Sequence, residues 1–578
     1  MFPLLCWDSI STPDLIMPLS VRAQVVVGLF GTIILLQGVS AGWAWLERRR
    51  HSKLVTRLDV NPELKEALQS IKQVLQAFEK DVRDDMKLDA ARDTLPAAIV
   101  NMLVLNTVHE RAAALEAPPV DGLKSKLLPK DEEIGMDAAR YIRFASAAYG
   151  MLMLKGANVM SWDCGWPDRS KLSRKEVNSW CITKHCGVAE EDLVKINLFE
   201  TRKLHLPAYI IVVDHATKSV VLSVRGTFSV QDAVTDLICD SAEFMGGSCH
   251  RGLRQGAEYL LEDAKDDLVK ALSQNIGYRL VLCGHSLGGG VSTLLTMIIL
   301  HRRRELGISR RTEVLCYAFA PPPVFGPLSK VPVEAKKAIR AFVFRNDMVP
   351  RLSLANAYGL FRDLKEVSTV GANLPSRCKY LLREHMPHVC VDDDGLGARG
   401  VMVSLRYSTI LHRTRSRGGK NKNKSKSTLD PKGKEEKPVA NGKERQDPLE
   451  SFVLRKLEED FTADGRARLP NPKNEYRARR TAVMAHRMGN DKYEKLIIPG
   501  NIFHMRKLGD IAAAALDGEG GAVGARSKAV YWMERELPIQ FARILMVDTA
   551  IVDHLPKSYE DALHNLYGEG LPQKEHKD

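Results

Sequence analysis

A serine set between glycines at the end of an apolar run is the feature that most constrains how this chain can fold. The stretch VLCGHSLGGG runs from Val281 to Gly290; YRLVLC, which leads into it, is typical of a buried strand, and LGGGVSTLLTMIILHRR, which leaves it, is typical of a helix. A sharp turn from strand to helix lifts a serine hydroxyl out of a sheet, beside a helix N-terminus that favours negative charge. The context therefore predicts that Ser286 is a nucleophile and not an ordinary turn serine.

Beyond residue 136, strand-like apolar segments alternate with helical patterns, which predicts an α/β fold. AYIIVVDHATKSVVLSVRG reads as two strands joined by a turn, EVLCYAFA and RAFVFR read as buried strands, and helical patterns follow Leu287 and surround VPVEAKKAI. Runs of this kind, apolar throughout, are typical of parallel strands covered on both faces. Together with the serine turn they predict an α/β-hydrolase fold with a mostly parallel sheet.

A serine nucleophile needs a base, and the base needs a carboxylate that orients it. In this architecture the acid follows a later strand and the histidine comes near the C-terminus. Asp347 fits the acid, since RAFVFRND is a strand that ends in a loop. His554 and His504 are the two candidates for the base. His554 is preferred because IVDHLPKSY predicts a loop before the last helix, whereas His504 lies in a probable strand.

The predicted oxyanion hole uses two backbone amides. One donor normally comes from the residue after the nucleophile, which is Leu287 here, and the other from a loop after an earlier strand. VLSVRGTFS ends such a strand, so the amide of Thr227 is the second candidate.

Several motifs in fixed order resemble the class 3 (fungal-type) lipases, in particular the sn-1-specific diacylglycerol lipases. These are RGTFSVQDAVTDL, CHRGL, GHSLGGG, RNDMVPRL and DHLPKSY, with ARYIRFASAAYG before them and IIPGNIFHM late in the chain. The resemblance covers about residues 136 to 412 and 490 to 565. It implies a Ser286, Asp347 and His554 triad, a lid near Asp232 to Gly247, a regulatory loop between acid and histidine, and stimulation by calcium.

Residues 25–46 carry no charge and are long enough to cross a bilayer as one helix. The basic residues from Arg48 to Lys53 follow directly, which favours a cytoplasmic location for the long C-terminal part. A cleaved signal peptide is the alternative, because small residues precede Gly42. The animal enzymes that the chain resembles have four N-terminal spans, and this sequence offers one.

Two further regions lack the alternation of strand-like and helical segments that is typical of the α/β domain. The segment ELKEALQSIKQVLQAFEK predicts an amphipathic helix within a stalk or cap, and RTRSRGGKNKNKSKS opens a lysine-rich stretch that predicts a disordered insertion. The expected organisation is a leader over residues 1–24, a membrane helix over 25–46, a helical stalk or cap and linker over 47–135, the first part of the α/β domain over 136–412, the insertion over 413–489, and the last part of the domain with a tail over 490–578.

Charge and cysteine usage narrow the expected partners. The formal net charge of +13 is concentrated in a few basic runs, which suit an anionic lipid surface; no nucleic-acid-binding module accompanies them. The ten cysteines are irregularly spaced and predict reduced thiols. Two groups could be read as metal ligands, but neither has a paired zinc spacing, so no metal site is expected in them, and a serine hydrolase mechanism requires no cofactor. The two groups are Cys181 with His185 and Cys186, and Cys378 with His385, His388 and Cys390.

The resemblance implies a membrane-anchored serine lipase that hydrolyses an acyl ester of a membrane glycerolipid, with diacylglycerol as the expected substrate. Three alternatives stay open from the sequence: a phospholipase A1, a triacylglycerol lipase, and a lipase-fold scaffold without activity. The sequence does not give the shape of the pocket that would separate them.

Overall fold

The computed structural model describes most of the predicted α/β region and leaves gaps elsewhere. Its residues are 129–156, 159–160, 173–198, 206–227, 241–369, 493–508 and 530–568, with short stretches between 73 and 109 and residue 377. The chain divides into two compact units, one of Met1–Leu88, His109–Arg362 and Met484–Asp578, and the other of Asp89–Val108 and Asp363–Val483. The candidate catalytic and oxyanion residues all belong to the first unit.

Among the described residues, the centre of the first unit is an eight-stranded mixed sheet in the order β1-β2-β3-β6-β7-β9-β10-β11. The pairs from β3 through β10 are parallel, and antiparallel pairs lie at both edges. The predicted α/β fold with a mostly parallel sheet is therefore confirmed. The strands are β1 (Leu193–Asn197), β2 (Tyr209–Asp214), β3 (Ser219–Val224), β6 (Arg279–His285), β7 (Val314–Phe319), β9 (Ile339–Phe344), β10 (Asn501–Leu508) and β11 (Val530–Glu536).

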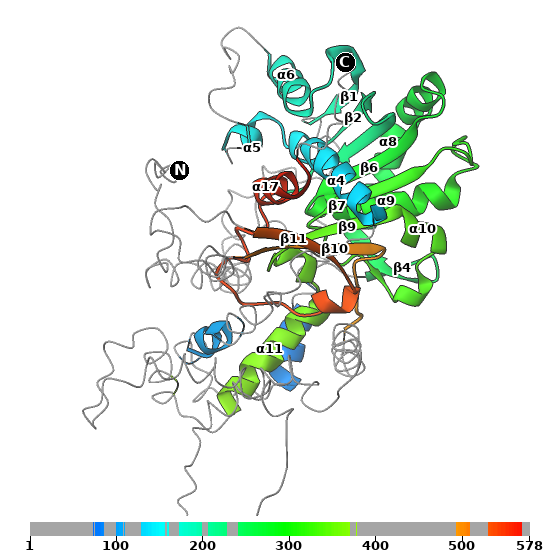
Figure 1. Cartoon of the computed structure of the whole chain (residues 1–578). Coiled ribbons are helices and arrows are strands. Elements are labelled where there is room, and N and C mark those ends of the chain that lie inside the picture. Colours follow the sequence, from blue (N-terminus) through cyan, green and yellow to red (C-terminus); the bar gives the residue numbers. More distant parts are fainter. Residues whose placement is uncertain are drawn as a thin grey trace, which may run out of the picture. The chain divides into compact units, whose positions relative to one another are not determined.

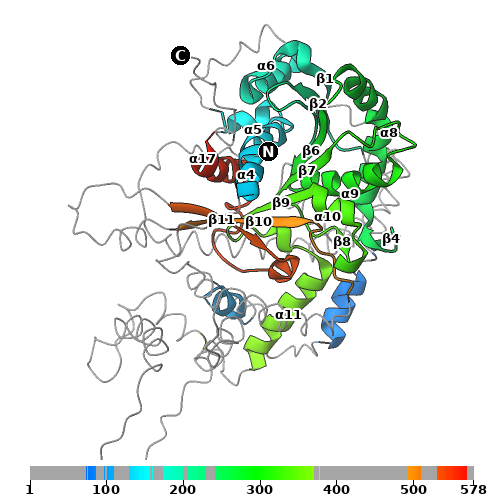
Figure 2. The same cartoon turned by 45° about the vertical axis from the view of Figure 1, so that its right-hand side comes forward.

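Helices cover both faces of this sheet (Figures 1 and 2). On one face α8 (Arg251–Gln274), α9 (Leu287–Arg302) and α10 (Val333–Ala338) share a hydrophobic core with the strands. On the other face the core is shared with α4 (Pro129–Ala147), α6 (Arg174–Cys186) and α17 (Pro556–Tyr567). Every residue of β2, β3 and β7 is buried as a result, which explains why these strands are mostly apolar.

Alternate side chains of strand β6 pack into the hydrophobic cores on the two faces of the sheet. Leu280 and Leu282 point into the core beneath α8 and α9, while Val281 and Cys283 point into the core beneath α4 and α17. This is the two-residue alternation of a strand. Since both sets are apolar, β6 is fixed from both sides, and the serine that follows it sits on a rigid element.

Smaller elements complete the described part of the chain. A three-stranded sheet has the order β4-β5-β8. Of the lid region implied by the resemblance, residues 232–240 lie outside the described residues, and 241–247 form β4 and the turn into β5. The bounds are β4 (Ser241–Phe244), β5 (Gly247–His250), β8 (Phe325–Gly326), α5 (Met151–Gly156), α11 (Leu354–Thr369), η2 (Glu190–Asp192), η3 (Leu328–Lys330), η4 (Val349–Arg351) and η5 (Pro538–Phe541).

Several sequence-based predictions fall on segments outside the described residues. These are the leader over 1–24, the membrane helix over 25–46, and the insertion over 413–489. None of the helices that the structure describes combines the length and the apolar character needed to span a bilayer. Within the predicted stalk or cap, helix is described at residues 76–85 and 100–107. Helix α4 starts at Pro129, before the predicted domain start at residue 136, because it packs on the sheet.

Candidate active site

Ser286 forms the turn between β6 and α9 in an unusual backbone conformation. Its φ is 60° and its ψ is −130°, a region that costs a non-glycine residue of order 1–3 kcal/mol and persists only where the surroundings impose it. Its amide donates to the carbonyl of Phe319 at 2.8 Å, and its carbonyl accepts from Gly290 at 3.1 Å. The turn is thus held by β7 on one side and by α9 on the other.

The glycines beside Ser286 allow helix and strands to approach closely. A β-carbon on Gly284 would lie 2.5 Å from the carbonyl carbon of Gly288, and one on Gly288 would lie 2.1 Å from the carbonyl oxygen of Val224. Real β-carbons do not approach backbone atoms so closely. The serine turn therefore depends on glycine at both positions, as the sequence pattern indicated.

The structure brings Ser286, His554 and Asp347 together from three separate segments. The Ser286 hydroxyl lies 3.0 Å from Nε2 of His554, and Nδ1 of His554 lies 3.0 Å from both carboxylate oxygens of Asp347. All three are buried; Asp347 is 0% exposed and His554 is 6% exposed. His554 lies in the loop before α17 and Asp347 in the loop after β9, where the sequence placed them.

Two donors besides His554 hold the carboxylate of Asp347. The amide of Val349 donates to Oδ1 at 2.9 Å, and the hydroxyl of Tyr559, in α17, donates to Oδ2 at 2.6 Å. Burial and the negative charge of Asp347 raise the pKa of Tyr559 well above its usual value, so the hydroxyl keeps its proton. The Tyr559 oxygen in turn accepts from the amide of Phe344 at 2.9 Å. Asp347 is therefore a buried carboxylate with its acceptor sites filled.

A second histidine supports the loop that carries His554. Nε2 of His285 donates to the carbonyl of His554 at 2.8 Å, and Nδ1 of His285 accepts from the Tyr149 hydroxyl, 3.0 Å away. The two imidazole rings lie 4.8 Å apart. Burial, with a further contribution from His554, holds the pKa of His285 well below 6.5. A neutral His285 beside His554 avoids placing two imidazolium charges together.

Asp553 joins the loop of the acid to the loop of the base. Its carboxylate lies 3.1 Å from the guanidinium of Arg345 and accepts from the amide of Asn346 at 3.2 Å and from the hydroxyl of Thr549 at 2.7 Å. Burial raises the pKa of Asp553, while Arg345 opposes that rise. The contacts fix the spacing between residues 345–347 and 549–554, and hence between Asp347 and His554.

The two candidate oxyanion donors lie next to the serine. Leu287 is the first residue of α9 and is 6% exposed. Thr227 follows β3, directly after Gly226. A β-carbon on Gly226 would lie 3.1 Å from the β-carbon of Ser286. The segment that carries Thr227 therefore adjoins the nucleophile, and its part in an oxyanion hole stays a prediction.

The other candidate residues occupy different surroundings. His504 lies in β10, and its Nε2 donates to the carbonyl of Arg345 at 2.8 Å, which ties β10 to the loop after β9. Of the first cysteine and histidine group, His185 pairs with Glu560 at 3.0 Å. No metal-binding group of three or more ligands occurs among the residues that the structure describes. The group that begins at Cys378 lies outside those residues.

The three residues predicted from the sequence lie together in the structure, whereas the residues that support them were not predicted. Tyr559 comes five positions after His554 in DHLPKSY, and Tyr149 is the last residue but one of ARYIRFASAAYG, so both lie in motifs quoted above. No spacing rule linked either of them to Asp347 or to His285. Asp553 and His285 are direct neighbours of site residues, but an adjacent position does not reveal where a side chain points.

The arrangement can move a proton away from a serine hydroxyl. His554 can accept it at Nε2 while Nδ1 donates to Asp347, so the imidazolium that forms is balanced by a buried carboxylate. Such a site suits attack on an ester carbonyl, provided that backbone amides stabilise the oxyanion.

Sequence comparison gives three relevant matches. Residues 221–357 match a protein-family model described as lipase (class 3). Diacylglycerol lipase-beta of Mus musculus is 29% identical over 299 residues, which are 48% of this chain and 43% of that protein. Diacylglycerol lipase-alpha of Homo sapiens is 30% identical over 207 residues, which are 33% of this chain and 19% of that protein. The chain thus matches less than half the length of either relative.

Comparison with solved structures gives fungal lipases. Lipase II from Rhizopus niveus matches with a TM-score of 0.30 and 21% identity, over 39% of this chain and 77% of that one. The lipase from Rhizopus microsporus var. chinensis matches with a TM-score of 0.29 and 21% identity, over 38% of this chain and 69% of that one.

Proposed function

Residues 221–357 place this chain in the class 3 lipase family, and from that premise we propose that it hydrolyses an acyl ester of a glycerolipid. The substrate that we propose is diacylglycerol, and the products are a monoacylglycerol and a fatty acid. The observation that carries the proposal is the hydrogen-bonded series from Ser286 through His554 to Asp347, with 3.0 Å at each step.

In the first half of the reaction, Ser286 attacks the carbonyl carbon of the ester. Its proton passes to Nε2 of His554, and Asp347 stabilises the imidazolium that results. The amides of Thr227 and Leu287 stabilise the oxyanion of the tetrahedral intermediate. When the intermediate collapses, the bond to the glycerol oxygen breaks, and that oxygen takes the proton from His554. The acyl group then remains on Ser286.

In the second half, water releases the acyl group. His554 takes a proton from the water as its oxygen attacks the acyl carbonyl, and a second oxyanion forms in the same place. Collapse of this intermediate returns the proton from His554 to Ser286 and frees the fatty acid. The cycle needs no electron carrier and no metal, so we propose that the enzyme works without a cofactor. Stimulation by calcium is a proposal that rests only on the family resemblance.

The choice of diacylglycerol rests on the relatives. The two animal proteins compared above are named as diacylglycerol lipases. The sequence motifs by which this chain resembles such lipases contain Ser286, Asp347 and His554. An α/β-hydrolase fold is part of the same proposal, because the serine turn between β6 and α9 has the geometry that such enzymes use.

A membrane location completes the proposal. A diacylglycerol lipase must act at a lipid–water interface, because its substrate is insoluble in water. The charge-free residues 25–46 would provide one anchor, the basic residues after them would place the catalytic part in the cytoplasm, and the basic runs would contact an anionic leaflet. Contacts near such a surface contribute about 1 kcal/mol per basic residue.

A substrate panel tests the proposal. Fatty-acid release is measured from diacylglycerol, phosphatidylcholine and triacylglycerol in mixed micelles, with the intact chain, Ser286→Ala and His554→Ala. We expect release from diacylglycerol by the intact chain and loss in both variants. His301→Ala is the control, since it makes the same kind of change at an exposed histidine near the end of α9.

Two outcomes would overturn the proposal. Preferred hydrolysis of phosphatidylcholine or triacylglycerol would assign a different lipase activity to the same residues. A folded chain that released no fatty acid from any of the three lipids would instead favour a scaffold that lacks activity.

A further inference from the structure

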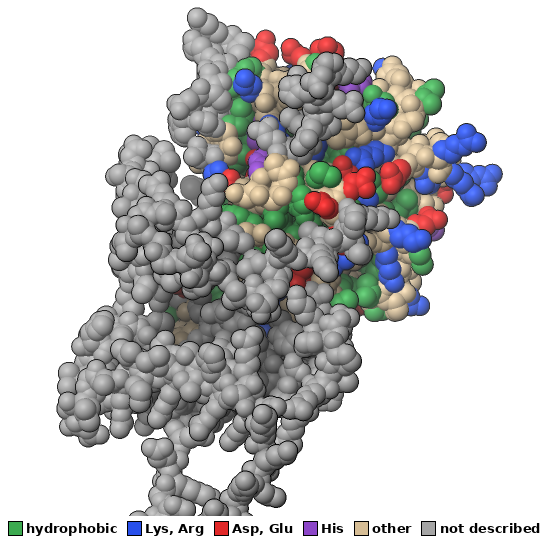
Figure 3. Space-filling model, viewed as in Figure 1, with side chains coloured by type: hydrophobic (Ala, Val, Ile, Leu, Met, Phe, Trp, Pro, Cys, Tyr) green, Lys and Arg blue, Asp and Glu red, His purple; other side chains and the backbone are tan. Residues whose placement is uncertain are grey.

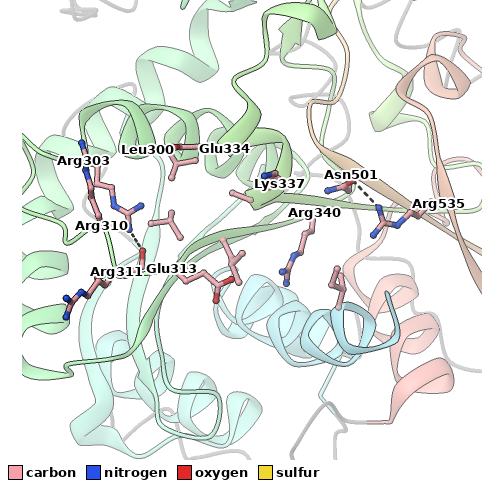
Figure 4. A pocket seen from close by; sticks show the side chains of 15 residues that line it. Leu300, Arg303, Arg310, Arg311, Glu313, Glu334, Lys337, Arg340, Asn501 and Arg535 are labelled. Atoms are coloured by element: carbon pink, nitrogen blue, oxygen red, sulfur yellow. Dashed lines mark hydrogen bonds between the residues drawn. The ribbon is translucent and has the colours of Figure 1, made fainter. Parts of the chain in front are cut away.

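A hollow of about 900 Å³ lies in the first unit, away from the candidate active site (Figure 4). Six basic and two acidic side chains line it. On the face that Figure 3 shows, acidic and basic side chains neighbour one another over much of the described surface, and basic side chains gather at its right-hand edge. The basic side chains are Arg303, Arg310, Arg311, Lys337, Arg340 and Arg535, and the acidic ones are Glu313 and Glu334.

The hollow lies at the amino ends of the parallel strands, whereas the nucleophile lies at their carboxyl ends. Val314 is the first residue of β7 and Asn501 the first of β10, and both line the hollow. Ser286 and Asp347 follow the ends of β6 and β9, which run parallel to β7 and β10. The two sites are therefore separated by the length of the strands, roughly 20 Å for a strand of six residues.

Three of the basic side chains have local partners. Arg535 pairs with Asp131, and Arg340 lies 3.7 Å from Asp137 and over the ring of Tyr317. Arg303 donates to the carbonyls of Ser309 and Thr312. These contacts fix the walls of the hollow.

The other three basic side chains, Arg310, Arg311 and Lys337, are exposed and share the hollow with Glu313 and Glu334. Within the part of the chain that the structure describes, no carboxylate forms an ion pair with Arg310, Arg311 or Lys337. Burial lowers the pKa of the neighbouring Arg303, and the positive charge of Arg310 lowers it further. The Glu334 carboxylate acts in the opposite direction and raises this pKa. Positive charge gathered in a concave surface attracts anions more strongly than the same charge on a convex surface.

From this juxtaposition we propose that the hollow binds a phosphate-bearing ligand with at least two negative charges. Arg310 and Arg311 would bind phosphate oxygens through their planar guanidinium groups, and Lys337 would add a point charge from α10. The volume falls in the range of small-molecule sites, about 300–1,000 Å³. Such a ligand can be a soluble phosphate ester or the headgroup of a phosphorylated lipid, which presents the same chemistry.

Binding to the full-length chain tests this proposal. Pyrophosphate is titrated by calorimetry as the soluble probe. Flotation with phosphatidylcholine vesicles, with and without phosphatidylinositol phosphate, is the lipid probe. The test variant is Arg310→Glu with Arg311→Glu. The matched control is Arg302→Glu with Arg304→Glu, which makes the same change in net charge on exposed side chains that do not line the hollow.

We expect the test variant to bind at least about tenfold more weakly, since one charge-assisted hydrogen bond is worth a factor of roughly ten, and the control pair to bind as the intact chain does. Such a loss seen with pyrophosphate supports a soluble ligand. A loss seen only with vesicles that contain the phosphorylated lipid supports a headgroup. Equal weakening in both variants, or no binding of either probe to the intact chain, would overturn the proposal.

Discussion

Individual hydroxyl and imidazole groups hold the candidate acid and base in position. Asp347 accepts from Val349, Tyr559 and His554, and the backbone carbonyl of His554 accepts from His285. A buried carboxylate is costly unless its acceptor sites are filled. The supporting side chains should therefore affect both the rate of reaction and the stability of the fold.

The change Tyr559→Phe removes one donor from Asp347 and leaves the rest of the ring in place. We expect kcat for diacylglycerol to fall by about tenfold or more, because a hydrogen bond to a charged group contributes about 1.5–3 kcal/mol. The KM should stay near that of the intact chain, because Tyr559 contacts Asp347 and not the proposed substrate. Tyr259→Phe, on an exposed side chain of α8, is the control. An unchanged kcat in Tyr559→Phe would contradict the role given to this hydroxyl.

The low pKa of His285 predicts how stability depends on pH. In the unfolded chain this histidine titrates near 6.5, while burial keeps it neutral in the folded chain. Below about pH 6.5 the unfolded chain therefore binds more protons, and His285 should lower the free energy of unfolding by up to about 1.4 kcal/mol per pH unit.

Chemical denaturation of the intact chain and of His285→Gln between about pH 7 and pH 5 measures this contribution. The variant lacks the titrating group, so any stability advantage of the intact chain should shrink as the pH falls. His301→Gln changes an exposed histidine and serves as the control. A difference between the intact chain and His285→Gln that does not change with pH would show that His285 is not held neutral.

The central site residues could be predicted from the sequence because their signals are local. Ser286 is marked by glycines between a strand and a helix, and Asp347 and His554 each follow an element in the expected chain order. Tyr559 and His285 act through contacts between segments distant in sequence, 212 residues apart for Tyr559 with Asp347. No single-sequence pattern records such a contact.

At the scale of elements, close packing of β3, β6 and α9 sets the position of the serine. Gly288 lies in the first turn of α9, against the backbone of β3. The same glycine run that made the sequence motif recognisable therefore has a packing role. This explains why the strand, turn and helix were predicted correctly as one unit.

The change Gly288→Ala should disrupt this packing, because the added β-carbon would lie 2.1 Å from the carbonyl oxygen of Val224. We expect a loss of about 1–3 kcal/mol in the free energy of unfolding, as for other overpacked core positions, together with reduced activity. Thermal and urea unfolding measure the loss. Gly359→Ala in α11 is the control, because nothing lies within 4 Å of its added carbon; it should be neutral or stabilising by up to about 1 kcal/mol. Equal stability of the two variants would argue against the packing role.

Elements at the edges of the sheet were harder to predict. The strands predicted from the sequence are β2, β3, β6, β7, β9 and β10, whose residues are mostly buried. The strands that were not predicted include β1 and β11, whose residues are partly exposed and mixed in character, and β8, which has two residues. Such strands form because a partner is already present, and their pairing is not local.

At the scale of the whole molecule, the candidate active site lies at the carboxyl ends of the parallel strands and the proposed basic site at their amino ends. The proposed membrane anchor, residues 25–46, lies outside the described part of the chain. The net charge of +13 is consistent with attraction to anionic surfaces. The anchor and the catalytic unit can be tested independently.

Removal of residues 1–46 should release the protein from membranes. We expect the intact chain to remain in the membrane pellet after a carbonate wash, and the shortened chain to appear in the supernatant. Diacylglycerol hydrolysis in mixed micelles should persist in the shortened chain, because no described contact of the site involves these residues. Release of the intact chain by carbonate would contradict a transmembrane anchor and would favour a surface attachment.

The central claim is that Ser286 is an activated nucleophile. Labelling of the full-length chain with a fluorophosphonate, followed by mass spectrometry of its peptides, tests this claim without assuming a substrate. We predict one adduct, on Ser286, that is absent in Ser286→Ala and forms much more slowly in His554→Ala. A folded chain that stays unlabelled, or carries the label on another residue, would contradict it.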